Sequence, residues 1–235
     1  MTKQFLTDGA EFTACGLRFI VNIEQDEDSS APWDKEDGHG PVGEWTSRDK
    51  KPGEWVLSGE RGSKRFYDAA EAMRIAHKDG WGLAEKYISE LTAKHGRTPT
   101  KGEITAEAVR RDFEYLRGWC NDEWHYVGVC VRHATQDADA RYSNALWGIE
   151  SLSDEYISEV AHQLAGECAQ DYVIPEIKAQ RETLKIIRQR VKELAADLRN
   201  GHVLPDSICR AVREKIGLLL AGRSAAHARI AELTA

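Results

Sequence analysis

Hydrophobic residues recur with helical spacing through the last quarter of the chain. Two rows alternate steps of four and three residues, with interruptions only at Gln180 and Arg223. The first row is Val173, Ile177, Leu184, Ile187, Val191, Leu194 and Leu198, and the second is Val212, Ile216, Leu219, Ala226, Ile230 and Leu233. Each row predicts a helix with a heptad seam. Between the rows, Asn200–Gly201 is typical of a helix end and Pro205 of a helix start, so we expect an antiparallel helical hairpin.

The preceding 172 residues mix strand and helix patterns. Apolar and polar residues alternate in "GLRFIVNIE" (16–24), which predicts a half-buried strand. The stretches 125–133 and 145–150 also favour strands, and the link between them fits a hairpin with a long tip. Helical periodicity predicts four helices, over 68–77, 82–94, 105–119 and 153–172. The expected class is therefore α+β: a small antiparallel sheet covered by helices, followed by the helical hairpin.

Aromatic residues and charge divide the chain near residue 172. All seven Trp lie between Trp33 and Trp147, and residues 173–235 contain no Phe, Tyr or Trp. Residues 1–172 hold 20 Lys+Arg against 32 Asp+Glu, a net of −12, and residues 173–235 hold 12 against 7, a net of +5. These shifts predict an acidic α+β domain over 1–172 and a basic hairpin over 173–235.

One hairpin cannot bury both seams completely, so we expect it to pair with a second copy or to dock on the first domain. In the first case the protein is a homodimer, and the seam of the first helix carries the contact. The residues assigned to this oligomerisation site are Leu184, Ile187, Val191, Leu194 and Leu198.

The bulk composition indicates a folded cytoplasmic protein. Hydrophobic residues make up 41% of the chain and charged residues 30%. The start "MTKQFLTDGAEF" lacks the features of a signal peptide, and the longest aliphatic run, Leu218–Leu220, is far too short for a membrane span. Five cysteines without a CxxC pair argue against both a disulfide scaffold and a zinc finger.

The stretch "PWDKEDGHGPVGEWTSRDKKPGEW" (32–55) is the best candidate for a functional loop. It is too polar, and too rich in Gly and Pro, to be a helix or a central strand. In one interpretation Asp34, Asp37 and His39, with Glu36 beside them, bind a divalent cation. In the favoured interpretation tryptophans anchor an exposed loop that contacts a partner. The residues assigned to partner binding are Trp33, Asp34, Glu36, Asp37, His39 and Trp45.

No catalytic motif is recognisable, so we expect neither catalytic residues nor a cofactor. Cys120 and His125 lie at a predicted helix-to-strand turn, where a Trp-rich packing corner is favoured over a nucleophilic pair. "GERGSK" (59–64) lacks the spacing of a phosphate loop and is interpreted as a turn.

Basic residues are frequent in the first tail helix: Lys178, Arg181, Lys185, Arg188, Arg190 and Lys192. Because Glu182 and Glu193 lie among them, the sequence favours an ordinary solvated surface over a DNA contact. DNA binding through this tail stays open as an alternative.

Three stretches carry a family resemblance: "GHGPVGEWTSRDKKPGEWVLSGERGSKRFYDAAEAMRIAHKDGW" (38–81), "LRGWCNDEWHYVGVCV" (116–131) and "LWGIES" (146–151). Together they resemble a family of uncharacterised proteins from tailed phages and prophages, over roughly residues 12–170. The resemblance implies an accessory protein that binds a host or phage protein complex, with inhibition of a host immune or restriction complex as the most specific expectation. The acidic first domain is compatible with this role. The alternatives are a metal-dependent hydrolase or nuclease using the acidic loop, and a DNA-binding protein using the basic tail.

Overall fold

The computed structural model describes residues 5–134, 143–199 and 206–234 and has the expected α+β class. The chain forms two compact units. The outer unit combines residues 1–26 with 127–235, and the inserted unit comprises residues 27–126. This division differs from the boundary expected near residue 172, because the sheet of the outer unit is built from both ends of the chain.

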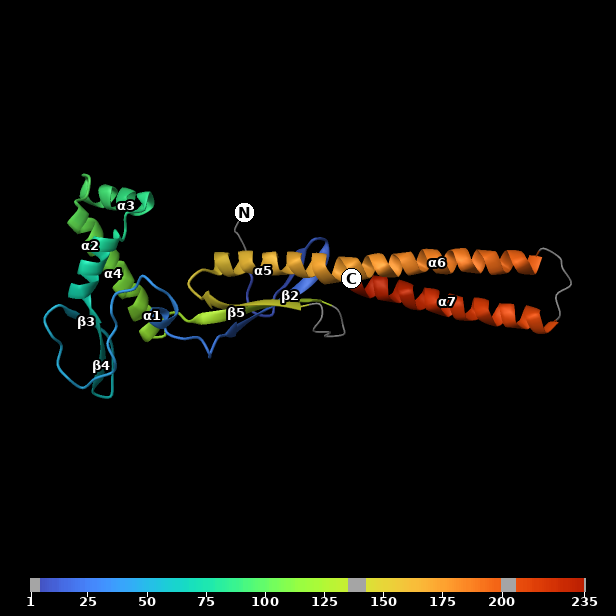
Figure 1. Cartoon of the computed structure of the whole chain (residues 1–235), viewed down its shortest axis with the longest axis horizontal. Helices are drawn as coiled ribbons and strands as arrows, with labels where there is room; N and C mark the ends of the chain where they lie inside the picture. Colours follow the sequence, from blue (N-terminus) through green and yellow to red (C-terminus); the bar gives the residue numbers. More distant parts are fainter. Residues whose placement is uncertain (1–4, 135–142, 200–205, 235) are drawn as a thin grey trace. The chain divides into compact units, whose positions relative to one another are not determined.

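The strands of the outer unit form a four-stranded sheet in the order β1-β2-β5-β6, of which β2 and β5 are labelled in Figure 1. Its strands are β1 (Glu11–Ala14), β2 (Leu17–Gln25), β5 (Tyr126–His133) and β6 (Ser143–Glu150). β2 and β5 are antiparallel and pair from Phe19↔His133 to Gln25↔Val127. The chain therefore leaves and re-enters the sheet at adjacent positions, a site where folded insertions are readily accommodated.

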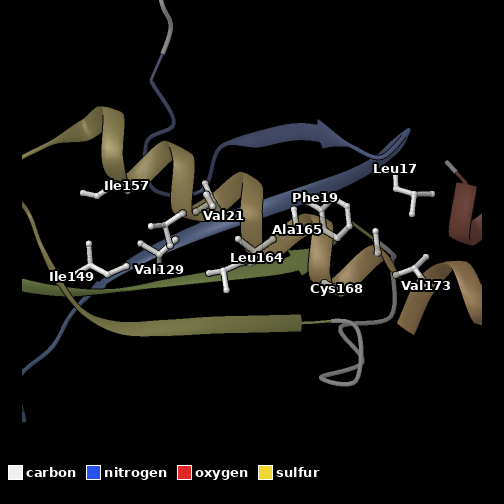
Figure 2. Packing of buried hydrophobic residues seen from close by; sticks show 14 of the residues in the cluster. Leu17, Phe19, Val21, Val129, Ile149, Ile157, Leu164, Ala165, Cys168 and Val173 are labelled. Atoms are coloured by element: carbon white, nitrogen blue, oxygen red, sulfur yellow. The ribbon is translucent and has the colours of Figure 1, made fainter. Parts of the chain in front are cut away.

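Helix α5 (Asp154–Cys168) covers one face of this sheet. Figure 2 shows Val21 of β2, Val129 of β5 and Leu164 of α5 directed into the space between helix and strands. All three side chains are buried, and the burial of Val21 is what the alternating pattern of 16–24 predicts for one face of β2. At the end of β5 the buried His133 packs edge-on against Phe19, with ring centroids 5.4 Å apart.

Helix α5 continues without a break into α6 (Ile174–Arg199) through one π-helical turn, Ala169–Val173. The amide of Ile174 donates to the carbonyl of Ala169, five residues earlier. Pro175 has no amide hydrogen to donate, and a π turn is a common way for a helix to absorb such a defect. The composition changes at residues 172–173, but the helix runs through this point.

Helix α7 (Asp206–Thr234) packs against α6 and completes the expected hairpin (Figure 1). Both seams are confirmed, since their members are buried or half-buried while most neighbouring residues are exposed. Ile187 and Leu194 are buried in α6, and Ala226 and Leu233 in α7. Two predicted connections lie outside the described residues. They are the link between the strands, of which only residue 134 is described, and the turn at Asn200–Gly201 with Pro205.

The inserted unit packs helices against a two-stranded sheet. Its strands are β3 (Glu54–Glu60) and β4 (Ser63–Asp68), and its helices are α1 (Pro32–Lys35), α2 (Ala69–Asp79), α3 (Glu85–His95) and α4 (Lys101–Cys120). "GERGSK" forms the β3–β4 turn, in which Arg61 and Gly62 both have positive φ. One hydrophobic cluster of this unit is centred on the buried side chains of Leu57, Tyr67, Val109 and Leu116.

In the described ranges, no helix combines the length and the hydropathy that crossing a bilayer requires.

Candidate partner-binding surface

Part of the candidate loop is attached to β4 by isolated β-bridges. Isolated bridges join Val42 to Tyr67 and Thr46 to Lys64. The amide of Gly43 donates to the carbonyl of Phe66 over 2.9 Å, and Thr46 and Lys64 exchange two backbone hydrogen bonds of 2.9 and 2.8 Å. Residues 42–46 are therefore held in place by the sheet, although their sequence is too polar and Gly-rich to predict a strand.

The carboxylate of Asp112, on α4, holds the first half of the loop. Its Oδ1 lies 2.6 Å from Nδ1 of His39. Its Oδ2 accepts two hydrogen bonds, from the amide of Gly40 at 2.8 Å and from the hydroxyl of Tyr67 at 2.7 Å. The side chains of His39 and Asp112 are only 14% and 9% exposed. One mostly buried carboxylate thus joins the loop, β4 and α4.

Close packing surrounds this carboxylate. The His39 ring stacks on Tyr115, with centroids 5.5 Å apart and planes 10° apart. Burial, and then the hydrogen bond to Asp112, hold the pKa of Tyr67 well above its usual range, so its hydroxyl remains a donor. A Cβ at Gly40 would lie 2.3 Å from the Tyr67 hydroxyl, so only glycine fits at this position.

Arginine side chains contact both ends of the loop. The Arg65 guanidinium lies 5.0 Å from the ring centroid of Trp33 and 5.3 Å from that of Trp45. Arg48 makes a two-point contact with Glu54, with Nη1 2.7 Å from Oε2. The hydrogen bond from Arg48 is the main reason that the pKa of Glu54 falls to about 2.

The outward side of the fixed loop is acidic. Asp34, Glu36 and Asp37 are exposed, and none has a cationic partner among the described residues. Together with His39 and Val42 they line an open hollow. Trp45 is 44% exposed. Residues 27–49 hold 7 Asp+Glu and 2 Lys+Arg, a net of −5, whereas residues 50–126 hold 13 and 14, a net of +1. The negative charge of the inserted unit is therefore concentrated on this segment.

The six predicted contact residues thus fall into two groups. Asp34, Glu36 and Asp37 are exposed and available for contact, and Trp45 is partly so. Trp33 and His39 act mainly as anchors: Trp33 packs edge-on against Trp119 at 5.2 Å, and His39 is held by Asp112. Partner binding by these residues stays a prediction.

Asp112 and Arg65, which organise the loop, were not identified from the sequence. Asp112 has one signal in hindsight, because it lies three residues after Val109 and four before Leu116, on the buried stripe of α4. A carboxylate on such a stripe requires a partner.

Metal binding by Asp34, Asp37 and His39 finds no geometric support. Within 5–134, 143–199 and 206–234, no group of three His, Cys, Asp or Glu side chains is placed to hold an ion. His39 instead directs Nδ1 to Asp112. At the predicted Trp-rich corner, burial raises the pKa of Cys120 to about 11, which keeps this thiol protonated at neutral pH and disfavours nucleophilic attack.

A second, more apolar hollow lies between α3 and α4, lined chiefly by Trp81, Tyr87, Leu91 and Ile104. Its charged rim is internally neutralised: Arg111 pairs with Glu90 at 2.8 Å and with Glu107 at 3.1 Å. The hydrogen bond from Arg110 is the main reason that the pKa of Glu107 falls to about 2, so this carboxylate is already paired with a cation of the chain.

The five seam residues assigned to oligomerisation face the interior of the hairpin. Ile187 and Leu194 are buried within the chain, while Leu184, Val191 and Leu198 are half-buried. The seam therefore serves first to join α6 to α7. Self-association through the hairpin stays a prediction.

Comparisons with protein-family models, with curated proteins and with solved structures find no match to this chain. The resemblance to the phage and prophage family accordingly stays a prediction.

Proposed function

We propose that this protein is a non-enzymatic binding protein whose acidic loop contacts a basic surface on another protein. The supporting observation is the rigid attachment of an uncompensated acidic segment: Asp112 and Arg65 hold the loop, and Asp34, Glu36 and Asp37 remain exposed without cationic partners among the described residues. A preorganised loop loses little conformational entropy on binding, and its charge accelerates encounter with a basic partner.

The resemblance to phage proteins narrows the proposal to counter-defence. A basic groove that binds nucleic acid in a host immune or restriction complex is the kind of surface that a dense acidic loop complements. In this role the protein competes with nucleic acid for the groove and catalyses no reaction.

The test is affinity capture from phage-infected cells with three baits. The first is the wild-type chain, and the second carries Asp34→Asn, Glu36→Gln and Asp37→Asn. The third, a matched control, carries Asp79→Asn, Glu85→Gln and Glu123→Gln, which neutralise three other exposed carboxylates of the same unit. We expect one set of proteins to be captured by the wild type and the control and lost with the loop variant. Equal capture by all three baits would exclude the loop as the contact.

Self-association through the hairpin is the second part of the proposal. Ile186 and Leu218 are 63% and 76% exposed, which is high for aliphatic side chains on helices that already have a buried seam. Substituting Ile187 would test folding rather than assembly, because Ile187 is buried against α7. The informative variant is Ile186→Lys with Leu218→Lys, studied by sedimentation velocity. We expect a wild-type dimer and a variant monomer, and a monomeric wild type would exclude this assembly.

A further inference from the structure

We infer that one face of α6 is a binding surface for the phosphate backbone of a nucleic acid. Six cationic residues follow one another along this helix at steps of three or four, apart from one step of seven past Ala195. They are Lys178, Arg181, Lys185, Arg188, Lys192 and Arg199, and together they are called the α6 stripe.

The six cations are brought together on one face only when the chain is helical. At 3.6 residues per turn the six members of the stripe fall within roughly 80° of the helix circumference, on a flank of the helix centred about 110° around from the middle of the seam. The four acidic residues of α6 all fall outside this sector: Glu176, Glu182, Glu193 and Asp197. Arg190 also lies outside it and pairs with Glu193 at 2.9 Å. The sequence interpretation placed Glu182 and Glu193 among these cations and favoured an ordinary solvated surface; around the formed helix both glutamates fall outside the stripe.

The stripe cations are exposed and mostly uncompensated. Lys178, Arg181, Arg188 and Lys192 have no carboxylate within ion-pair distance among the residues that the structure describes. Lys185 pairs with Glu182 at 2.8 Å, an exposed contact that another anion can replace at small cost. The Nε of Arg199 donates to the carbonyl of Ala195, which leaves its terminal nitrogens available.

The length and spacing of the stripe fit a polyanion rather than a single anion. At a rise of 1.5 Å per residue, Lys178 and Arg199 are about 32 Å apart along the axis, close to one turn of B-form DNA at about 34 Å. A linear array of exposed cations recognises the regularly spaced charges of a phosphate backbone, without preference among bases. This inference is independent of the acidic loop, which lies in the other unit.

The experiment measures fluorescence anisotropy of the full-length chain with a labelled DNA duplex of about 20 base pairs and with one of its single strands, from about 50 to 200 mM salt. The stripe variant carries Lys178→Gln, Arg181→Gln, Arg188→Gln and Lys192→Gln. The control removes the same charge elsewhere on the hairpin, through Arg190→Gln, Arg210→Gln, Lys215→Gln and Arg223→Gln, all at exposed positions.

We expect the stripe variant to bind at least tenfold more weakly, with the slope of log K against log salt reduced by about 4, and the control to keep the wild-type slope. The two DNA forms identify which backbone is preferred. The single variants Arg181→Gln and Arg188→Gln are each expected to lower the slope by about 1. They test the inference even if the fourfold variant loses helicity. Three results would overturn the inference: no binding to either DNA form, equal losses in both fourfold variants, or binding to polyglutamate as tight as binding to DNA.

Discussion

Nδ1 of His39 and Oδ1 of Asp112 lie 2.6 Å apart although 73 residues separate them in the sequence. The same carboxylate binds Gly40 and Tyr67, so one side chain of α4 determines where the acidic loop begins and which way it faces. The loop conformation is therefore a consequence of the inserted unit's core, and substitutions in this core should alter the loop without touching its exposed carboxylates.

Asp112→Ala removes the acceptor of three polar groups in a mostly buried site. We expect a loss of about 3 kcal/mol in the free energy of unfolding of the inserted unit, because the Tyr67 hydroxyl and the Gly40 amide lose their partner. Asp112→Asn should cost less, since its amide oxygen can still accept hydrogen bonds from the Gly40 amide and the Tyr67 hydroxyl. Urea denaturation measures both. Asp122→Asn is the control: Asp122 has a φ of 58°, which asparagine tolerates, and an unchanged stability is expected.

Gly40→Ala tests the close approach of the loop to Tyr67. The added Cβ would overlap the Tyr67 hydroxyl and ring, at 2.3 to 2.6 Å, so the loop must move and the hydrogen bonds to Asp112 must lengthen. We expect about 2 kcal/mol of destabilisation and faster amide hydrogen exchange in residues 38–46. Gly102→Ala in α4 is the matched control, because no atom lies within 4 Å of its Cβ position. The control should be neutral or more stable by up to about 1 kcal/mol. Equal effects at both glycines would contradict the assigned loop packing.

Elements whose apolar residues are periodic could be predicted from the sequence. The heptad rows located both tail helices, and the alternation in 16–24 located β2. Asp68 caps α2 as its spacing to Glu71 predicts, by accepting a hydrogen bond from the Glu71 amide. Ser151 has the same spacing to Asp154, yet the cap of α5 is Ser153, whose hydroxyl accepts a hydrogen bond from the Tyr156 amide; spacing alone does not choose between the two serines.

Elements stabilised by distant contacts could not be predicted in this way. Strand β3 contains Ser, Gly and two Glu, and pairing with β4 rather than its own propensity makes it a strand. Helix α4 begins at Lys101, earlier than the periodicity indicates, because Thr100 and Glu103 form a capping box ahead of the first apolar turn. The loop residues were identified as a surface, but the carboxylate that orients them belongs to another element.

Ile186 and Ile187 are adjacent in α6, but truncating them should change stability by very different amounts. Ile187 is buried, and its Cδ1 faces Gly222 of α7, whereas Ile186 is largely exposed. Ile187→Ala should lower the free energy of unfolding of the outer unit by about 2 to 4 kcal/mol, through lost burial and a cavity. Ile186→Ala should change it by less than about 0.5 kcal/mol in a monomer. Chemical denaturation followed by circular dichroism compares the two, and similar losses would contradict the assigned seam.

The outer unit should lose stability in mild acid because of His133. This ring is buried against Phe19, donates to the backbone carbonyl of Leu233, and is near Arg18, Arg229 and Glu232. Burial lowers the pKa of His133 below its ordinary value of 6.5. Below pH 6.5 the unfolded chain therefore binds the proton before the folded one does, and stability falls as the pH drops toward the folded-state pKa. Hydrogen exchange of β5 amides between about pH 5 and 7 measures this slope. His133→Gln should abolish it, and His162→Gln, at an exposed histidine of the same unit, should retain it. A slope that persists in His133→Gln would assign the acid sensitivity to another group.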